Sequence, residues 1–280
     1  MKKAHGVTRL STALDVPRST LYERLARRSR PAPKAQQRLL REVREIHRQT
    51  RGSYGRRRMS QELRQRSFDV GPFRARQLMR EAGLRVRAAR PPIYPRSHGK
   101  PDAVAPNLLD RQFDVTTPGT VFAGDITYIW THQKWLYLAI VMDLASRRIV
   151  GWATSDTPDT QLTMRALRLA LPQRHTEQTL LFHSDQGCQY TSEAFRTFLG
   201  QHDVTQSMSR RGNCWDNAPV ERFFHSLKGE WLGETVHDTQ SQARQDIDRY
   251  IAGFYNTHRL HAAAGGKPPA VRHAELRKAA

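Results

Sequence analysis

The chain has 280 residues, 38% of them hydrophobic, which allows one large domain with a smaller one or two modest domains. Its 46 Lys and Arg residues outnumber the 26 Asp and Glu residues and give a net charge of +20, which excludes an acidic chain and favours a polyanionic partner. The chain has only two cysteines, which excludes a disulfide scaffold. Its longest apolar run, Trp135 to Met142, is too short to span a membrane, and no apolar stretch follows the basic start, which excludes a signal peptide. We therefore expect a soluble, cytoplasmic protein.

The excess positive charge lies in the first third of the chain. Residues 1–100 hold 27 Lys and Arg against 7 Asp and Glu, a net of +20, whereas residues 101–280 hold 19 of each kind. Each Lys or Arg that approaches a phosphate releases counterions, so a block this basic favours nucleic acid as the partner. A solvated basic surface or a disordered tail remains the alternative.

Residues 1–32 carry a helix-turn-helix pattern. A first helix is predicted from Val7 to Leu14, and a second helix begins at Thr20, where Thr20 and Glu23 fit a capping box. The second helix of such a motif can enter a DNA major groove. A packed helical hairpin that never touches DNA is the alternative. The residues that we expect to contact DNA here are Arg18, Ser19, Thr20 and Arg24.

Residues 33–87 are predicted to form a second, helix-turn-helix-like DNA-binding region. Apolar residues at helical spacing predict helices over 38–50, 56–65 and 73–82. Arg74 and Arg76 on the last of these helices are the expected DNA contacts. Residues 88–118 hold six of the chain's 15 prolines and are predicted to be a linker or an extended arm.

Beyond residue 119 the apolar pattern changes from the period of helices to that of strands. Five β-rich runs, the first three forming a meander, are expected at 121–130, 135–144, 148–154, 179–183 and 204–208. Helices, the first of them capped at Thr157 and Pro158, are expected up to residue 171 and then over 191–202, 219–231 and 241–258.

This order of elements indicates an α/β fold, a ribonuclease-H-like five-stranded mixed sheet with helices on both faces. The core is expected over 119–232, with a C-terminal helical extension over 233–280. In this fold the first and fourth strands are neighbours, which would bring Asp125 and Asp185 together and let Glu221 approach from a helix packed across them.

Three acidic residues are the candidate catalytic and metal-binding groups. Asp125 lies in an otherwise apolar strand, where a carboxylate is costly without a cation. Asp185 follows a strand end, and Glu221 lies at a helix start with 35 residues between it and Asp185. Each alone has an ordinary structural explanation in a turn, an ion pair or a helix dipole. Together, three carboxylates from separate elements can hold two Mg²⁺ ions, and two such ions can cut and rejoin phosphodiesters.

Other polar residues near these acids have structural roles that we favour over catalytic ones. Asp143 closes its strand before a turn, and Asp216 and Asn217 precede the Glu221 helix, where a helix cap suits them. His183 lies two residues before Asp185, and both a role in the site and a structural role stay open for it.

Five short motifs, taken together with the three acids, are specific enough to indicate a family. They are Asp125-Ile126-Thr127-Tyr128, His183-Ser184-Asp185-Gln186-Gly187, Gln189-Tyr190-Thr191-Ser192, Asp216-Asn217-Ala218 and Tyr255-Asn256-Thr257-His258-Arg259. With these motifs the chain resembles, over nearly its whole length, the OrfB-type transposases of the two-reading-frame insertion-sequence-three group. Those transposases belong to the retroviral-integrase-like DDE superfamily, and the 35 residues before Glu221 are also the family's spacing.

The resemblance implies a transposase that binds the terminal inverted repeats of an insertion sequence in a bacterial cell. Its activity would be Mg²⁺- or Mn²⁺-dependent DNA cleavage, which leaves a 3′-OH, followed by strand transfer. Asp125, Asp185 and Glu221 would hold two ions, and Lys228 and Arg222 would contact DNA, although Lys228 can equally be a solvated helix lysine. The resemblance also implies a homo-oligomer on double-stranded DNA and an upstream-frame, OrfA-type partner or fusion.

Two other functions remain open. A catalytically inactive DNA-binding regulator could be built on the same scaffold, but the intact acid triad argues against it. A retroviral integrase or a stand-alone nuclease of the same fold is disfavoured because the chain has no His-His-Cys-Cys zinc module and carries two helix-turn-helix candidates.

Overall fold

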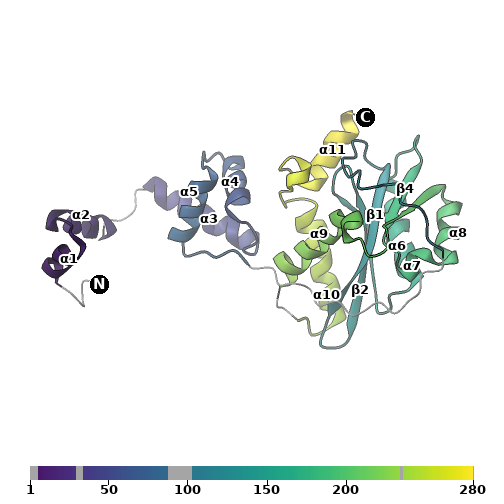
Figure 1. The fold of residues 1–280 in the computed structure, drawn as a ribbon, viewed down its shortest axis with the longest axis horizontal. Helices are drawn as coiled ribbons and strands as arrows, with labels where there is room; N and C mark the ends of the chain where they lie inside the picture. Colours follow the sequence, from purple (N-terminus) through teal and green to yellow (C-terminus); the bar gives the residue numbers. More distant parts are fainter. Residues whose placement is uncertain (1–5, 30–33, 88–102, 234–235, 280) are drawn as a thin grey trace.

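The computed structural model describes residues 6–29, 34–87, 103–233 and 236–279. The five helices of the basic region are α1 (Val7–Leu14), α2 (Arg18–Ser29), α3 (Lys34–Gln49), α4 (Arg56–Gln65) and α5 (Pro72–Glu81). The five strands after them are β1 (Val121–Trp130), β2 (Trp135–Asp143), β3 (Ile149–Ser155), β4 (Leu180–Ser184) and β5 (Val204–Met208). Figure 1 shows this order along the chain.

The helices of the second half alternate with the last strands and then follow them. The α-helices are α6 (Thr160–Ala170), α7 (Cys188–Thr191), α8 (Glu193–Gln201), α9 (Ala218–Ser226), α10 (Gln240–Asp248) and α11 (Pro269–Ala279). Two π-helical segments extend α9 and α10, namely η3 (Leu227–Leu232) and η4 (Arg249–Tyr255). Short 3-10 turns are η1 (Leu171–Gln173), η2 (Cys214–Asn217) and η5 (Ala262–Ala264). None of the described helices is both long and apolar enough to cross a bilayer.

The five strands form one mixed sheet in the order β3-β2-β1-β4-β5. β1 is antiparallel to β2 and parallel to β4, with Ala123 opposite His183 in the register. This arrangement confirms the predicted five-stranded sheet and the predicted pairing of its first and fourth strands. The first residues of β1 therefore lie beside β4, and both Asp125 and Asp185 come two residues after the last paired residues, Ala123 and His183.

Helices cover both faces of the sheet, with α9 and α10 on one side and α6, α7 and α8 on the other (Figure 1). Because side chains alternate along a strand, Phe122 packs with the α6 and α8 residues, while Ala123 packs with the α9 and α10 residues. Asp125 shares the α9 face with Ala123 for the same reason. Gly151 lets α6 approach β3, since a Cβ there would lie 2.2 Å from the Ala166 carbonyl oxygen.

Several predicted helix ends differ from the structure for local reasons. α2 begins at Arg18 rather than Thr20, since the Pro17 carbonyl already accepts the Leu21 N–H, so Thr20 is not a cap. The side chain of Asp159 caps α6 by accepting the Leu162 N–H, in place of the expected cap at Thr157 and Pro158.

Longer predicted helices are interrupted. The helix expected over 191–202 is α8, which begins only at Glu193 because the side chain of Ser192 caps it; the short helix α7 before it was not predicted. The helices expected over 219–231 and 241–258 change to π-helix after Ser226 and Asp248.

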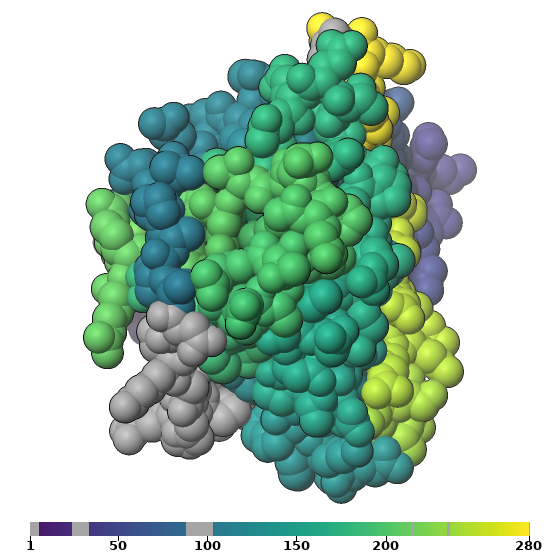
Figure 2. Space-filling view, turned by 90° about the vertical axis from the view of Figure 1, so that its right-hand side faces the viewer, coloured from purple at the N-terminus to yellow at the C-terminus, as the bar shows by residue number. Residues whose placement is uncertain are grey.

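The segment predicted as a linker, 88–118, is described only from residue 103 onward. Residues 103–118 form no helix or strand, but they pack along the edge strand β5. The backbone N–H groups of Leu108 and Leu109 donate to the Ser207 hydroxyl at 2.9 and 3.2 Å. In Figure 2 this segment, in blue, runs beside the green residues that follow β5. The described half of the linker is thus part of the packed domain that contains the sheet, residues 103–279.

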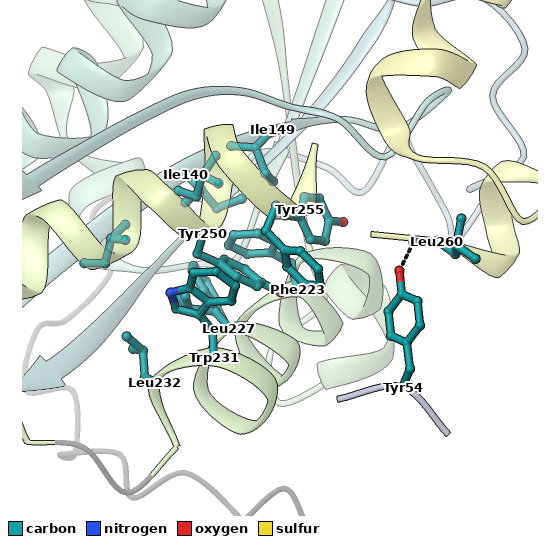
Figure 3. Packing of buried hydrophobic residues seen from close by; sticks show 14 of the residues in the cluster. Tyr54, Ile140, Ile149, Phe223, Leu227, Trp231, Leu232, Tyr250, Tyr255 and Leu260 are labelled. Carbon is teal, nitrogen blue, oxygen red and sulfur yellow. Dashed lines mark hydrogen bonds between the residues drawn. The ribbon is translucent and has the colours of Figure 1, made fainter. Parts of the chain in front are cut away.

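The module α3–α5 packs against the C-terminal part of the domain that contains the sheet, through Tyr54 (Figure 3). Its hydroxyl accepts the Leu260 N–H at 3.0 Å and donates to the His258 carbonyl at 3.3 Å. The Tyr54 ring lies 6.5 Å from the Phe254 ring, and the buried residues of both parts form one continuous hydrophobic cluster. The module is therefore anchored to the domain that contains the sheet rather than merely tethered to it.

Replacing Tyr54 with Phe should lower the free energy of unfolding by about 1–3 kcal/mol, because the Leu260 N–H loses its partner while staying buried. Urea unfolding measures this change. Tyr250→Phe is the matched control, since the Tyr250 hydroxyl in the same cluster has no hydrogen-bond partner among the described residues. An equal loss in both variants would contradict this account of the anchor.

Candidate active site

The three acids predicted from the sequence line one cavity of about 430 Å³. Asp125 comes from the middle of β1, Asp185 from the residue after β4, and Glu221 from the first turn of α9. The opposite wall is the loop after β5, which contributes Arg211 and Asn213 among others. The cavity therefore combines three carboxylates with a basic wall.

Asp125 occupies a position in which ionisation is costly. Burial, and then the negative charge of Asp185, raise the pKa of Asp125 well above its ordinary value. One carboxylate oxygen accepts the Ile126 N–H at 2.7 Å, which only partly offsets these effects. The residue before it must be glycine, because a Cβ at Gly124 would lie 2.6 Å from the Phe182 ring.

Asp185 and Glu221 reach the solvent of the cavity, yet both are disfavoured as anions. Burial raises the pKa of Asp185, against the effect of the Gly187 N–H that donates to its carboxylate at 3.0 Å. Burial also raises the pKa of Glu221, and the charge of Asp185 raises it further. The carboxylates thus repel one another across a single cavity, as groups do that share a cation.

Lys228 is the basic side chain that acts on this cluster. It is half-buried in η3, where desolvation lowers its pKa to about 8 while the negative charge of Asp125 opposes that shift. The spacing from Glu221 is not that of a regular α-helix, because the helix becomes π-helical after Ser226. Lys228 is nevertheless close enough for its charge to stabilise the Asp125 carboxylate.

Asp216 holds the basic wall in place rather than joining the acids. It is fully buried and accepts from Arg111 Nε at 2.7 Å and from Arg210 Nε at 2.9 Å. The hydrogen bonds from Arg210 hold the pKa of Asp216 well below its ordinary value, against the effect of burial. It also accepts from Asn107, so it joins the loop after β5 to the segment before β1.

Three further polar residues, for which the sequence favoured a structural role or left the role open, make structural contacts. Asn217 precedes α9 but makes no capping bond; its side chain instead donates to the Gly124 carbonyl at 3.4 Å. His183 is buried between Ser207 and Ser209, and burial lowers its pKa to about 4, so it joins β4 to β5 as a neutral ring. Asp143 accepts the Gly119 N–H at 3.0 Å, far along β2 from the acids.

The donor set of the cavity fits a hard divalent cation. Carboxylate oxygens are the ligands that Mg²⁺ and Mn²⁺ prefer, and the salt bridges found among the described residues include none to these three acids. Among the described residues, no three His, Cys, Asp or Glu side chains are already gathered closely enough to enclose an ion. Mg²⁺ does not require such an enclosure, since it is commonly held by one or two carboxylates together with water and substrate phosphates.

The expected DNA contacts lie outside this cavity, apart from Lys228 beside it. The side chains of Arg18 and Ser19 are exposed on α2, Thr20 is half-buried, and the side chain of Arg24 is not among those described. Arg222 is exposed on α9, on a side from which its charge reaches Arg147 and His261.

On α5, the two expected DNA contacts differ in their surroundings. Arg76 is exposed. Arg74 is engaged within its module, at 3.5 Å from Glu81 and hydrogen-bonded to Gln36.

The basic wall of the cavity was missed by the sequence analysis. Arg210, Arg211 and Asn213 surround Gly212, whose φ of 72° places it in the left-handed region. Two arginines before a turn glycine, directly after a predicted strand, were the signal that could have indicated them.

Three sequence models of known domains match the chain. An integrase core domain matches residues 115–214, a second integrase core domain model matches residues 202–269, and an HTH-like domain matches residues 34–92. The first two together cover the sheet and all three acids.

Two relatives are similar over most of the chain. The transposase InsF of insertion sequence IS3A from Escherichia coli (strain K12) is 39% identical over 218 residues, which cover 77% of this chain and 75% of the relative. A 31 kDa uncharacterized protein of insertion element IS600 from Shigella sonnei is 36% identical over 258 residues, which cover 91% of this chain and 94% of the relative.

Solved structures show more distant similarity. The HTLV-2 integrase catalytic core domain in complex with magnesium has a TM-score of 0.43 at 17% identity, covering 56% of this chain and 97% of that one. A chain of the simian T-cell lymphotropic virus intasome in complex with the PP2A regulatory subunit B56 gamma has a TM-score of 0.47 at 15% identity, covering 82% of this chain and 74% of that one.

Asp125→Asn should raise the free energy of unfolding at pH 7 in metal-free buffer. Folding raises the pKa of Asp125. Ionisation of Asp125 therefore lowers the stability of the wild type as the pH rises from the pKa of the unfolded state, about 4, through the pKa of the folded state. The gain should disappear below about pH 4, where the carboxyl is neutral in both states. Mg²⁺ should then stabilise the wild type more than the variant.

Urea unfolding at several pH values measures this effect, with Asp143→Asn as the matched control. Asp143 is a buried acid that accepts N–H groups, so its replacement should destabilise the protein at pH 7. An Asp125→Asn variant less stable than the wild type in metal-free buffer at pH 7 would contradict the assignment of a strained carboxylate.

Proposed function

The chain belongs to the IS3-family transposases with an integrase catalytic core, and on that premise we propose that Asp125, Asp185 and Glu221 perform its DNA cleavage and strand transfer. A transposase of this kind is a polynucleotidyl transferase that carries out DNA transposition. The observation that carries the proposal is the shared cavity, in which three carboxylates with raised pKa values face a basic wall. The buried acids Asp216 and Glu230 form ion pairs with arginines, whereas Asp125 and Asp185 accept only backbone N–H groups.

The proposed chemistry is an in-line displacement at phosphorus. Attack by water breaks a phosphodiester and leaves a free 3′-OH; attack by that 3′-OH on a second phosphodiester joins the element end to its target and releases the target's own 3′ oxygen. Two Mg²⁺ or Mn²⁺ ions, when bound by the three acids, would supply Lewis-acid stabilisation of the attacking and the leaving oxygens. No covalent bond between the protein and DNA is required.

The side chains of the chain have distinct proposed roles in this reaction. The charges of both Asp185 and Glu221 act on Asp125. Asp125 would therefore bind both ions, whereas Asp185 and Glu221 would each bind one. Arg211 would contact a phosphate group beside the scissile one, since it lines the cavity. Lys228 would contact another, since its charge already acts on Asp125. Their charges would hold the DNA strand against the carboxylates.

The basic N-terminal block would deliver the element ends to this site. The helix-turn-helix α1–α2 and the module α3–α5 hold the chain's excess positive charge, and the proposed partner is double-stranded DNA at the terminal inverted repeats and the target. We further propose a homo-oligomer on DNA, because two element ends must be joined, and an upstream-frame, OrfA-type partner or fusion.

Glu221→Gln should reduce strand transfer by about 10²–10⁴-fold, because the neutral amide cannot replace a carboxylate that balances cationic charge in the transition state. The measurement is product formation from a labelled terminal-repeat duplex with Mg²⁺. The control is Glu193→Gln on the exposed start of α8, away from the cavity, which should act like the wild type. Equal product from the wild type and Glu221→Gln would reject the catalytic assignment and favour a DNA-binding regulator.

DNA binding by the full chain should weaken by about 10²–10⁴-fold between roughly 50 and 200 mM salt, since many Lys and Arg contacts with phosphates release counterions. Fluorescence anisotropy with a labelled duplex, in the absence of divalent metal, measures this dependence. An affinity that does not change over this range of salt would contradict binding through the basic block.

A further inference from the structure

A large aromatic side chain stands exposed at the start of α5. Phe73 is 71% exposed, although a phenylalanine in water gains nothing for folding. Tyr22 and Trp215 are also exposed, but Phe73 lies in the first turn of the second helix of a helix-turn-helix, α4 followed by α5. The N-terminal residues of that helix are the ones that contact base edges in this type of motif.

Phe73 belongs to a solvent-facing stripe of α5. Residues three and seven positions later share its face of the helix, and these are Arg76 and Arg80, both exposed. The buried residues of α5 are Ala75, Leu78 and Met79, which pack against α3 and α4. The free face of the helix thus presents one aromatic ring and two guanidinium groups.

The charge of this face is complementary to a polyanion. Glu81 is the one acidic residue in the sequence of α5, and Arg74 binds it, so it does not offset Arg76 or Arg80. The first 100 residues carry the whole net charge of +20. An acid-free face within so basic a block would repel a basic protein surface and attract DNA.

The module anchors to the catalytic domain through residues other than those of α5. The Arg51 guanidinium lies 3.7 Å from the centre of the Trp231 ring and 3.2 Å from Asp246, and Arg58 lies 2.9 Å from Glu230. Within the described part of the chain, none of the hydrogen bonds or ion pairs to the catalytic domain comes from α5. Its stripe therefore stays free while the rest of the module is held.

We propose that Phe73 contacts the 5-methyl group of a thymine in the major groove of the terminal-repeat DNA, with Arg76 and Arg80 on either a phosphate or a base edge beside it. An aromatic ring has no hydrogen bond to offer a base edge, and the thymine methyl group is the apolar feature of the major groove. The inference rests on the proposed function in one respect, namely that the chain binds its element's terminal repeats.

The test uses the full chain and a labelled duplex of the terminal repeat, without divalent metal, with each thymine in turn replaced by deoxyuridine. Deoxyuridine lacks only the methyl group, so at one or two positions it should weaken wild-type binding about 3–5-fold. Phe73→Ala should bind the thymine duplex about tenfold more weakly and should no longer distinguish uracil from thymine at those positions. Its thermal unfolding should match that of the wild type, because the ring is exposed.

Two further variants separate methyl recognition from other roles. Phe73→Leu keeps an apolar side chain and should retain part of the discrimination, whereas Arg76→Ala should weaken binding to both duplexes and leave their ratio unchanged. The proposal is overturned if no thymine is sensitive in the wild type, or if the sensitivity persists in Phe73→Ala. It is also overturned if Phe73→Ala changes self-association but not DNA affinity, since the ring would then contact protein.

Failure of the proposed function gives a different pattern. A wild type that binds the terminal repeat no better than a scrambled duplex would show that the chain does not recognise the repeat, whatever Phe73 does. Loss of methyl discrimination with intact preference for the repeat would concern Phe73 alone. The comparison of strand transfer between the wild type and Glu221→Gln tests the catalytic acids and gives no information on the contact made by Phe73.

Discussion

Three carboxylates held against their mutual repulsion are the constraint on which the rest of the catalytic domain depends. Asp125 sits inside a strand, and each of the three acids has a pKa raised by burial. Such groups lower stability at neutral pH unless a cation accompanies them. The surrounding structure must therefore be rigid enough to keep Asp125, Asp185 and Glu221 around one cavity without the help of direct bonds between them.

Other acids of the same domain show how different the three are. Asp216 is buried but binds two arginines, and Glu230 is held between Arg58 and Arg259. Asp143 accepts backbone N–H groups instead. Asp125, in contrast, is stabilised by the charge of Lys228, whose own pKa is lowered by burial. This contrast separates acids that stabilise the fold from acids that are suited to bind a cation. Active sites commonly contain groups of the second kind, which lower stability but are needed for function.

Parallel pairing of β1 with β4 brings Asp125 and Asp185, which are distant in the sequence, to the same cavity. The five strands could be predicted from their apolar period. The pairing of β1 with β4, which makes Asp125 and Asp185 neighbours, could be predicted only from the resemblance of the element order to a ribonuclease-H-like fold. The basic wall could not, since Arg211 reaches the cavity only through the turn at Gly212 and the long-range clamp on Asp216. Nor could the anchor at Tyr54, whose partner Leu260 is more than 200 residues away in the chain.

Local helix signals were overridden in a consistent way. Thr20 looked like a cap because of Glu23, but Pro17 had already begun the helix. Arg74 and Arg76 looked equivalent as DNA contacts, and only the structure shows that one is bound to Glu81 while the other is exposed. Capping and charge patterns therefore predict the kind of element. The ends of a helix and its solvent-exposed face depend on contacts that the local sequence pattern does not show.

The claim that the three acids form one cation site is tested most directly by anomalous diffraction from crystals of the chain with Mn²⁺ and a terminal-repeat duplex. The account predicts anomalous peaks within coordination distance of Asp125 and Asp185, and of Asp125 and Glu221, with octahedral oxygen ligands. Peaks elsewhere, or none at this cavity while DNA is bound beside it, would contradict it.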